Sequence, residues 1–218
     1  MFNILPVMKL LSLNIGKPQP FTYHERQGFT FIFKLPVEGV REVSFLNVEG
    51  DEQGDLSVHG GALKAVYSYD ISYYDHWKGI LNRNDWSYGM FGENLTTEGM
   101  PDDNILIGNI YKIGSVVLRA VQPRFPCFKL NIRFEMENML QQFMQQAKHG
   151  TYFSVVQEGS MKAGDTIELL ETSKHKISIQ QLVEAYNNKG ADQQIVEKIL
   201  AIDFLPERLR RTFVSFLR

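Results

Sequence analysis

A single cysteine is the residue of this sequence best suited to soft-metal binding or nucleophilic chemistry. Cys127 is the only thiol among 218 residues, so it has no disulfide partner within the chain. It directly follows Gln122-Pro123-Arg124-Phe125-Pro126, whose prolines prevent continuation as a helix or as a fully paired central strand. A nearby guanidinium favours the reactive thiolate form. The alternative is that Cys127 is a small buried apolar residue.

A loop between two predicted strands carries paired glycines beside a histidine. It runs from Glu49 to Asp55 and continues into Val58-His59-Gly60-Gly61. Paired glycines allow positive φ angles and close approach of backbone amides to an anion. His59 can donate or accept a hydrogen bond, so this loop could bind a phosphate or an oxo group. The alternatives are a simple Gly-Gly turn and a histidine that only satisfies backbone carbonyls.

Polar residues also follow Gly92 and lie on both sides of Cys127. Glu93 and Asn94 place a carboxylate and an amide directly after Gly92, and Glu93 could cap its loop. Arg124 presents a planar guanidinium suited to two-point phosphate binding, and Lys129 and Asn131 come shortly after it. These segments together supply a soft sulfur ligand, cations, a histidine and backbone amides. An anionic cofactor that carries a thiophilic metal would use all of them.

Other familiar sites fit this sequence less well. Zinc needs several protein ligands, and the five histidines show no paired spacing beside the single cysteine. A cysteine–histidine nucleophile would lack the accompanying hydrolase signatures. No P-loop and no dinucleotide-binding glycine motif follows a strand. There is no cysteine cluster for an iron–sulfur centre.

The elements that must position these loops are mostly short strands separated by Gly or Asp turns. The pattern predicts a mainly β fold with some α: a curved or closed β-barrel with inserted helices, then a small three-helix domain. We divide the chain into an N-terminal extension (1–8), the barrel (9–172) and the helical domain (173–218). The candidate strands are 9–13, 28–34, 42–48, 65–68, 110–113, 115–121, 152–157 and 166–170.

Two helices are predicted within the barrel. The first spans about 70–81, with Asp70 as its N-cap. The second spans 135–148 and ends before Gly150. We interpret its apolar face as core packing rather than as a cofactor-binding stripe. That face consists of Met136, Met139, Leu140, Phe143, Met144 and Ala147.

The C-terminal segment has the pattern of three short helices. Ser178 and Gln181 have the spacing of a capping box, and the next helices are predicted to begin after Asp192 and near Pro206. A segment of about 45 residues is small for independent stability. We therefore expect it to dock on the barrel or on another chain, and a homodimer is one such arrangement.

Composition narrows the class of protein. Hydrophobic residues make up 44% and aromatic residues 12% of the chain, which is enough for a packed core. The net charge of −2 creates no global field that would recruit nucleic acid or a membrane. The start of the chain lacks the basic region of a signal peptide, and no stretch has the length of a membrane span. We expect a cytoplasmic protein.

Three motifs, in this order, resemble those of MOSC domains (molybdenum cofactor sulfurase C-terminal domains). They are Gly50-Asp51-Glu52-Gln53 with Val58-His59-Gly60-Gly61, then Phe91-Gly92-Glu93-Asn94-Leu95, then Gln122-Pro123-Arg124-Phe125-Pro126-Cys127. The likeness covers roughly residues 9–172. The tail resembles the three-helix extension of the bacterial YiiM-type branch of this family.

The resemblance implies a β-barrel that binds molybdenum cofactor, a molybdopterin carrying molybdenum. Cys127 would be a ligand of the metal. Arg124 and Lys129 would face the pterin phosphate, while His59 and Glu93 would transfer protons or orient the ligands. The other cofactor-binding candidates are His59, Gly60, Gly61, Asn94 and Asn131.

The resemblance also implies an activity. Relatives in this branch reduce N-hydroxylated compounds, including N-hydroxylated purines and amidoximes, so a small molecule of that class is the expected substrate. A separate electron-donor protein is then required. Two alternatives remain open: a sulfur carrier or transferase that uses a Cys127 persulfide, and a non-catalytic module that carries or senses the cofactor.

Overall fold

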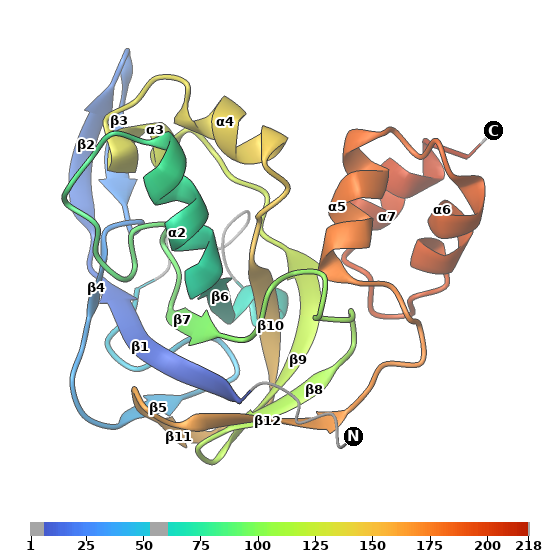
Figure 1. Ribbon diagram of the computed structural model, residues 1–218, viewed down its shortest axis with the longest axis horizontal. Coiled ribbons are helices and arrows are strands. Elements are labelled where there is room, and N and C mark those ends of the chain that lie inside the picture. Colours follow the sequence, from blue (N-terminus) through green and yellow to red (C-terminus); the bar gives the residue numbers. More distant parts are fainter. Residues whose placement is uncertain (1–6, 53–60, 218) are drawn as a thin grey trace.

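A computed structural model describes residues 7–52 and 61–217 of the chain, and a closed barrel forms its centre. The main sheet runs in the order β12-β8-β9-β10-β6-β7-β1-β4, and pairing between β12 and β1 closes seven strands on themselves (Figure 1). Only β6 and β7 are parallel among these described pairs. The predicted closed β-barrel is therefore confirmed, and its sheet is mixed. Its strands are β1 (Met8–Gly16), β4 (Lys34–Pro36), β6 (Val66–Asp70), β7 (Leu95–Glu98), β8 (Ile110–Ile113), β9 (Val116–Pro123), β10 (Thr151–Gln157) and β12 (Thr166–Glu171).

Alternating side chains fill the barrel. Along β9, Val116, Leu118 and Ala120 are fully buried and point into the interior, while the residues between them are half-buried. Leu10 and Phe153 from β1 and β10 join the same core. Burial of these apolar side chains stabilises the barrel. The polar side chains of the candidate site lie at the ends of the strands.

Two predicted strands are interrupted in the structure. The segment 28–34 is shared between β3 (Arg26–Thr30), which pairs with β2 (Gln19–Tyr23), and β4, which pairs with β1. Since the two halves have different partners, one continuous strand was a wrong prediction. The segment 42–48 was also wrong, because β5 (Arg41–Val43) ends in a turn closed by the hydrogen bond from Ser44 N–H to the Asn47 carbonyl at 2.9 Å. β5 pairs instead with β11 (Gly159–Met161).

The first inserted helix, α2 (Ile71–Ile80), follows the prediction. The Asp70 carboxylate accepts from Ser72 N–H at 3.0 Å and caps it. The helix buries Tyr74 and Trp77 in a second apolar cluster outside the barrel. Phe91 and Phe143 complete the centre of that cluster, so aromatic rings link α2 to the loops around the site.

The second inserted helix, α4 (Met139–Gln145), is shorter than the predicted range 135–148, so those bounds were wrong. A separate short helix before it, α3 (Lys129–Phe134), was not predicted. Glu135 adopts a left-handed conformation with φ 54° and ends α3, and Ala147 lies beyond α4 with φ 51°. The apolar stripe still packs inward, as Met139 and Phe143 are fully buried.

The C-terminal segment forms the three predicted helices, α5 (Ile179–Asn187), α6 (Gln193–Leu200) and α7 (Glu207–Val214), beside the barrel (Figure 1). The capping box of Ser178 and Gln181 is present. Backbone hydrogen bonds join Ile107 to Ile177 at 2.8 Å and Ile179 to Ile105 at 2.9 Å. The bundle therefore docks on the barrel and shares its hydrophobic core. No helix in the described parts of the chain has the length and apolar character to cross a bilayer.

Candidate functional site

A pocket lies where β9 leads into α3, and it collects side chains from distant parts of the chain. Cys127 is half-buried in its wall, two residues before α3 begins, and its carbonyl accepts from Leu130 N–H at 2.9 Å. Arg124, Lys129 and Asn94, three of the residues predicted from the sequence, share this pocket with the thiol. The complete lining is Phe31, Ile32, Lys34, Asp51, Glu52, Lys64, Tyr67, Gly92, Asn94, Arg124, Cys127, Lys129 and Tyr152.

Arg124 is a buried cation with spare hydrogen-bonding capacity. Its guanidinium lies over the rings of Tyr67 and Phe143, at 5.3 Å and 5.5 Å from the ring centroids. Its Nη1 atom is buried and has no hydrogen-bond partner among the described residues. A buried donor without a partner costs free energy, so this nitrogen is suited to an anion that enters the pocket.

Other cations add to the positive charge of the pocket. Lys129 lines it next to Cys127, and the Lys64 ammonium lies 5.9 Å from the centroid of the Tyr152 ring. Burial and the positive charge of Arg208 lower the pKa of Lys64. An anionic ligand would relieve this repulsion, so the electrostatics favour such a ligand.

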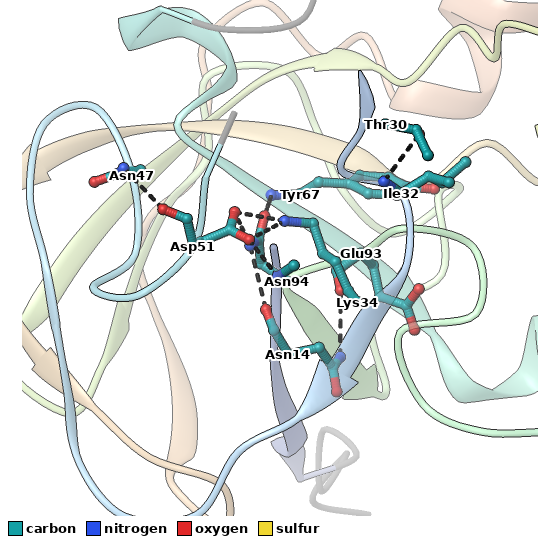
Figure 2. Close-up of polar contacts among 10 residues, drawn as sticks. Asn14, Thr30, Ile32, Lys34, Asn47, Asp51, Tyr67, Glu93 and Asn94 are labelled. Atoms are coloured by element: carbon teal, nitrogen blue, oxygen red, sulfur yellow. Dashed lines mark hydrogen bonds and ion pairs between the residues drawn. The ribbon is translucent and has the colours of Figure 1, made fainter. Parts of the chain in front are cut away.

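A buried ion pair forms another part of the wall (Figure 2). Lys34 Nζ donates to the Asp51 carboxylate at 2.5 Å, and both side chains are almost fully buried. Asp51 also accepts from Gly16 N–H at 2.7 Å and from Asn94 Nδ2 at 2.9 Å. Burial lowers the pKa of Lys34, although the charge of Asp51 acts in the opposite direction. Because the pair is neutral overall and Glu52 is the only other carboxylate among the described lining residues, the excess positive charge of the pocket comes from Arg124, Lys64 and Lys129.

Asn94 reaches the pocket but is held by the backbone around it. Its Oδ1 accepts from Tyr67 N–H at 3.2 Å, and its Nδ2 also donates to the Asn14 carbonyl at 3.3 Å (Figure 2). Asn94 thus joins β1, β6 and the Asp51 carboxylate. These contacts give it a structural role, and its place in the lining leaves it available to a ligand.

Glu93 is not among the residues that line the pocket. Its buried carboxylate accepts from the Tyr74 hydroxyl, from Gly89 N–H at 2.9 Å and from Phe91 N–H at 3.1 Å. It also accepts from the Thr96 hydroxyl at 2.8 Å. Burial raises the pKa of Glu93, and these hydrogen bonds oppose that rise. The structure therefore places Glu93 as the organiser of the loop before β7.

Asn131 also lies outside the lining. Its Nδ2 donates to the Glu137 carbonyl at 2.7 Å and to the Tyr23 hydroxyl at 3.0 Å. Its Oδ1 accepts from Leu140 N–H at 2.7 Å, so it ties α3 to α4. The predicted residues His59 and Gly60 fall outside the described residues. Gly61 is described, with φ 89°, and directly precedes the single-turn helix η1 (Ala62–Lys64).

Sequence reasoning missed several lining residues, chiefly Lys34, Lys64, Tyr67 and Tyr152. Lys34 carried a usable signal, because it is a lone charge after the apolar run Phe31-Ile32-Phe33. A buried lysine of that kind requires a partner. Tyr67 and Tyr152 gave no such signal, because the pattern of their strands predicts only that their rings are buried.

The fold and the site define a class: a closed β-barrel whose pocket presents one thiol beside several cations. In the described residues, no group of three or more His, Cys, Asp or Glu side chains is arranged to hold a metal ion. A metal bound at Cys127 would therefore need further ligands from outside the described residues, such as a cofactor or solvent. Residues 55–168 match the sequence profile of the MOSC domain, and the chain belongs to the MOSC domain family.

Known proteins resemble the chain over most of its length. The uncharacterized protein YflK of Bacillus subtilis (strain 168) is 36% identical, covering 94% of this chain and 93% of YflK. The crystal structure of YiiM from Geobacillus stearothermophilus matches with a TM-score of 0.81 and 28% identity, over 97% of this chain and 100% of that one. A protein of Gibberella moniliformis (strain M3125 / FGSC 7600) named "Reductase" is 36% identical over 82% of this chain, which covers 34% of that longer protein.

Proposed function

We propose that this protein binds a molybdenum–pterin cofactor at Cys127 and reduces N-hydroxylated compounds such as amidoximes and N-hydroxylated purines. The observation that carries the proposal is the pairing of a half-exposed thiol with the unpartnered buried nitrogen of Arg124 in one pocket. A soft sulfur suits a thiophilic metal, and a guanidinium suits a phosphate. Membership of the MOSC family and the name of the Gibberella relative support a reductase.

Different residues of the pocket would bind different parts of the cofactor. Cys127 would hold the metal, and Arg124 with Lys129 would bind the pterin phosphate. When bound, the cofactor supplies a two-electron redox couple and a position that accepts the substrate oxygen. Phe31, Tyr67 and Tyr152 give the pocket an aromatic wall, which would exclude water from one side of the ligand. Electrons would come from a separate donor protein.

The direct test is to purify the protein from a host that makes the cofactor. We expect stoichiometric molybdenum, pterin fluorescence, and reduction of an amidoxime by an artificial low-potential reductant. Cys127→Ser should lose the molybdenum and the activity, because a hydroxyl is a poor ligand for a soft metal. A matched control, Ser115→Ala at an exposed turn, should retain both. Full activity in Cys127→Ser would exclude the proposed ligand.

The partial exposure of Cys127 also favours a second function, sulfur transfer. A persulfide on this thiol would be accessible to a partner protein. Intact-mass measurement separates the two functions. An adduct of one sulfur atom on Cys127, without bound molybdenum, would favour the carrier, whereas bound metal with turnover would favour the reductase. Bound pterin without turnover would indicate a binding module.

A further inference from the structure

The segment from Arg124 to Cys127 lies beyond the last paired residue of β9, so its support comes from elsewhere. The Arg124 amide donates to the Gly150 carbonyl at 3.1 Å, and the Arg124 carbonyl accepts from His149 Nδ1 at 3.1 Å. Burial lowers the pKa of His149 to about 4, so its ring is neutral at pH 7. Because the Arg124 carbonyl can only accept, we assign the ring proton to Nδ1. The His149–Gly150 turn therefore holds Arg124 from both sides.

Asp102 holds that turn and connects it to the C-terminal helices. Its carboxylate is buried, and Oδ2 accepts from the N–H groups of His149 and Gly150 at 2.9 Å each. Its backbone carbonyl accepts from Gln180 N–H, in the first turn of α5, at 3.1 Å. A chain of hydrogen bonds thus runs from α5 through Asp102 to Arg124.

A second contact reaches the same segment through side chains. The Tyr186 ring of α5 packs on Phe125, with 4.4 Å between the ring centroids. Phe125 also meets the His149 ring at 5.5 Å, and Tyr186 is backed by Phe213 and Phe216 at 6.5 Å and 6.4 Å. Since Phe125 is two residues before Cys127, the helical bundle supports the thiol-bearing segment directly.

We infer that the C-terminal bundle positions the Arg124–Cys127 segment, with Tyr186 and Asp102 as the positioning residues. Two independent contacts from α5 converge on a segment that no strand holds. The docked bundle is therefore a structural part of the site rather than only an appended domain. This role concerns the geometry of the pocket, and it stands whichever ligand or reaction the pocket serves.

The lone cysteine allows a direct test in the full-length protein. Cys127 is labelled with small iodoacetamide and with a bulky polymer-linked maleimide, and both rates are measured under native conditions. Tyr186→Ala should raise the rate with the bulky reagent by about tenfold or more, because the segment opens locally more often. Tyr186→Phe keeps the ring contact and should label like the wild type. Asp102→Ala should raise the rate with the bulky reagent as Tyr186→Ala does. Asp102→Asn keeps an oxygen acceptor, so its labelling rate should be close to that of the wild type.

A control separates local opening from general instability. Met161→Ala removes a buried side chain of β11, which pairs with β5, and should lower global stability without changing the labelling rates. Wild-type labelling of Tyr186→Ala would overturn the inference. Equal acceleration in Met161→Ala would overturn it too, since global unfolding would then explain the effect. If Tyr186→Ala fails to fold, Tyr186→Leu, which retains bulk without the ring, makes the same comparison.

Discussion

At the scale of single residues, Arg124 presents a buried positive charge that is positioned to bind an anionic ligand. Aromatic rings cover its guanidinium, its backbone is held on both sides, and its Nη1 atom has no partner in the described structure. A buried cation left in this state lowers stability unless an anion binds it. The residue is therefore placed for binding at some cost to the stability of the ligand-free fold.

Replacing Arg124 by Met should separate those two effects. The variant loses the proposed contact with the cofactor phosphate, so its molybdenum and pterin content should fall about tenfold or more. Its thermal stability without cofactor should be unchanged or higher, because a buried cation with one nitrogen lacking a partner is gone. Metal analysis and calorimetry measure the two results. Wild-type cofactor content in Arg124→Met would contradict the assignment.

Asp102 gives the protein a pH dependence at the same scale. Burial, the largest cause, raises the pKa of this carboxyl from 3.8 to about 7, and the negative charges of Asp70 and Asp103 add to the rise. The Tyr73 hydroxyl accepts from its backbone N–H at 2.6 Å, and neutral His149 lies on its other side. The folded state therefore binds the Asp102 proton more tightly than the unfolded state does.

This difference has a definite sign. Stability from Asp102 is fully present below pH 4 and is lost as the pH rises through about 7. Asp102→Asn cannot ionise, so from pH 5 to pH 8 it should lose less stability than the wild type, by more than about 1 kcal/mol. Urea denaturation at both pH values gives the comparison. Parallel pH curves for the two proteins would show that Asp102 is not the responsible group.

At the scale of elements, the site arises at the exit of β9. Pairing with β10 ends at Pro123, and the chain turns through the cysteine segment into the short helix α3. Glu135 then ends α3 in a left-handed conformation that costs an L-residue free energy. This break lets α4 pack on the aromatic cluster behind Arg124.

Glu135→Gly should therefore stabilise the protein by about 0.5–1 kcal/mol, because glycine adopts this conformation without strain. Glu135 is exposed, and its side chain makes no hydrogen bond or ion pair with the described residues that would be lost. Glu168→Gly, at an exposed position within β12, is the matched control and should destabilise. Denaturant midpoints measure both changes, and a destabilised Glu135→Gly variant would contradict the strain argument.

At the scale of the whole molecule, one hydrophobic cluster runs from the barrel into the helical bundle. It contains Leu118 and Phe153 of the barrel together with Leu182 and Phe213 of the helices. Because this core is shared, we expect the two parts to unfold together, although the sequence divides them near residue 173.

Phe213→Ala tests this cooperation. The fully buried ring lies in α7, and its loss should cost about 3–5 kcal/mol. Both tryptophans, Trp77 and Trp86, belong to the aromatic cluster that packs on β6 of the barrel, so their fluorescence reports the barrel part of the molecule rather than the bundle. The fluorescence midpoint should fall together with the helical circular dichroism signal. An unchanged tryptophan midpoint would mean that the barrel unfolds independently of the bundle.

The success and failure of sequence prediction follow from the range of the forces involved. The starts of three helices were predicted correctly from the N-cap residues Asp70, Ser178 and Asp192, because an N-cap acts within a few residues of its own position. The bounds 135–148 of the second inserted helix were wrong because the spacing of apolar residues does not reveal a left-handed residue such as Glu135. The split at 28–34 was missed because it depends on two different partner strands.

For the site, the sequence by itself determined the lone thiol, the arginine beside it and the rigid prolines that frame them. Their grouping with Asn94 and Lys129 in one pocket agrees with that reading. Only the tertiary structure decided that Glu93 organises a loop, that Lys34 pairs with Asp51, and that α5 supports the segment before Cys127. These contacts join residues far apart in the chain, and their energies depend on burial, which local sequence does not specify.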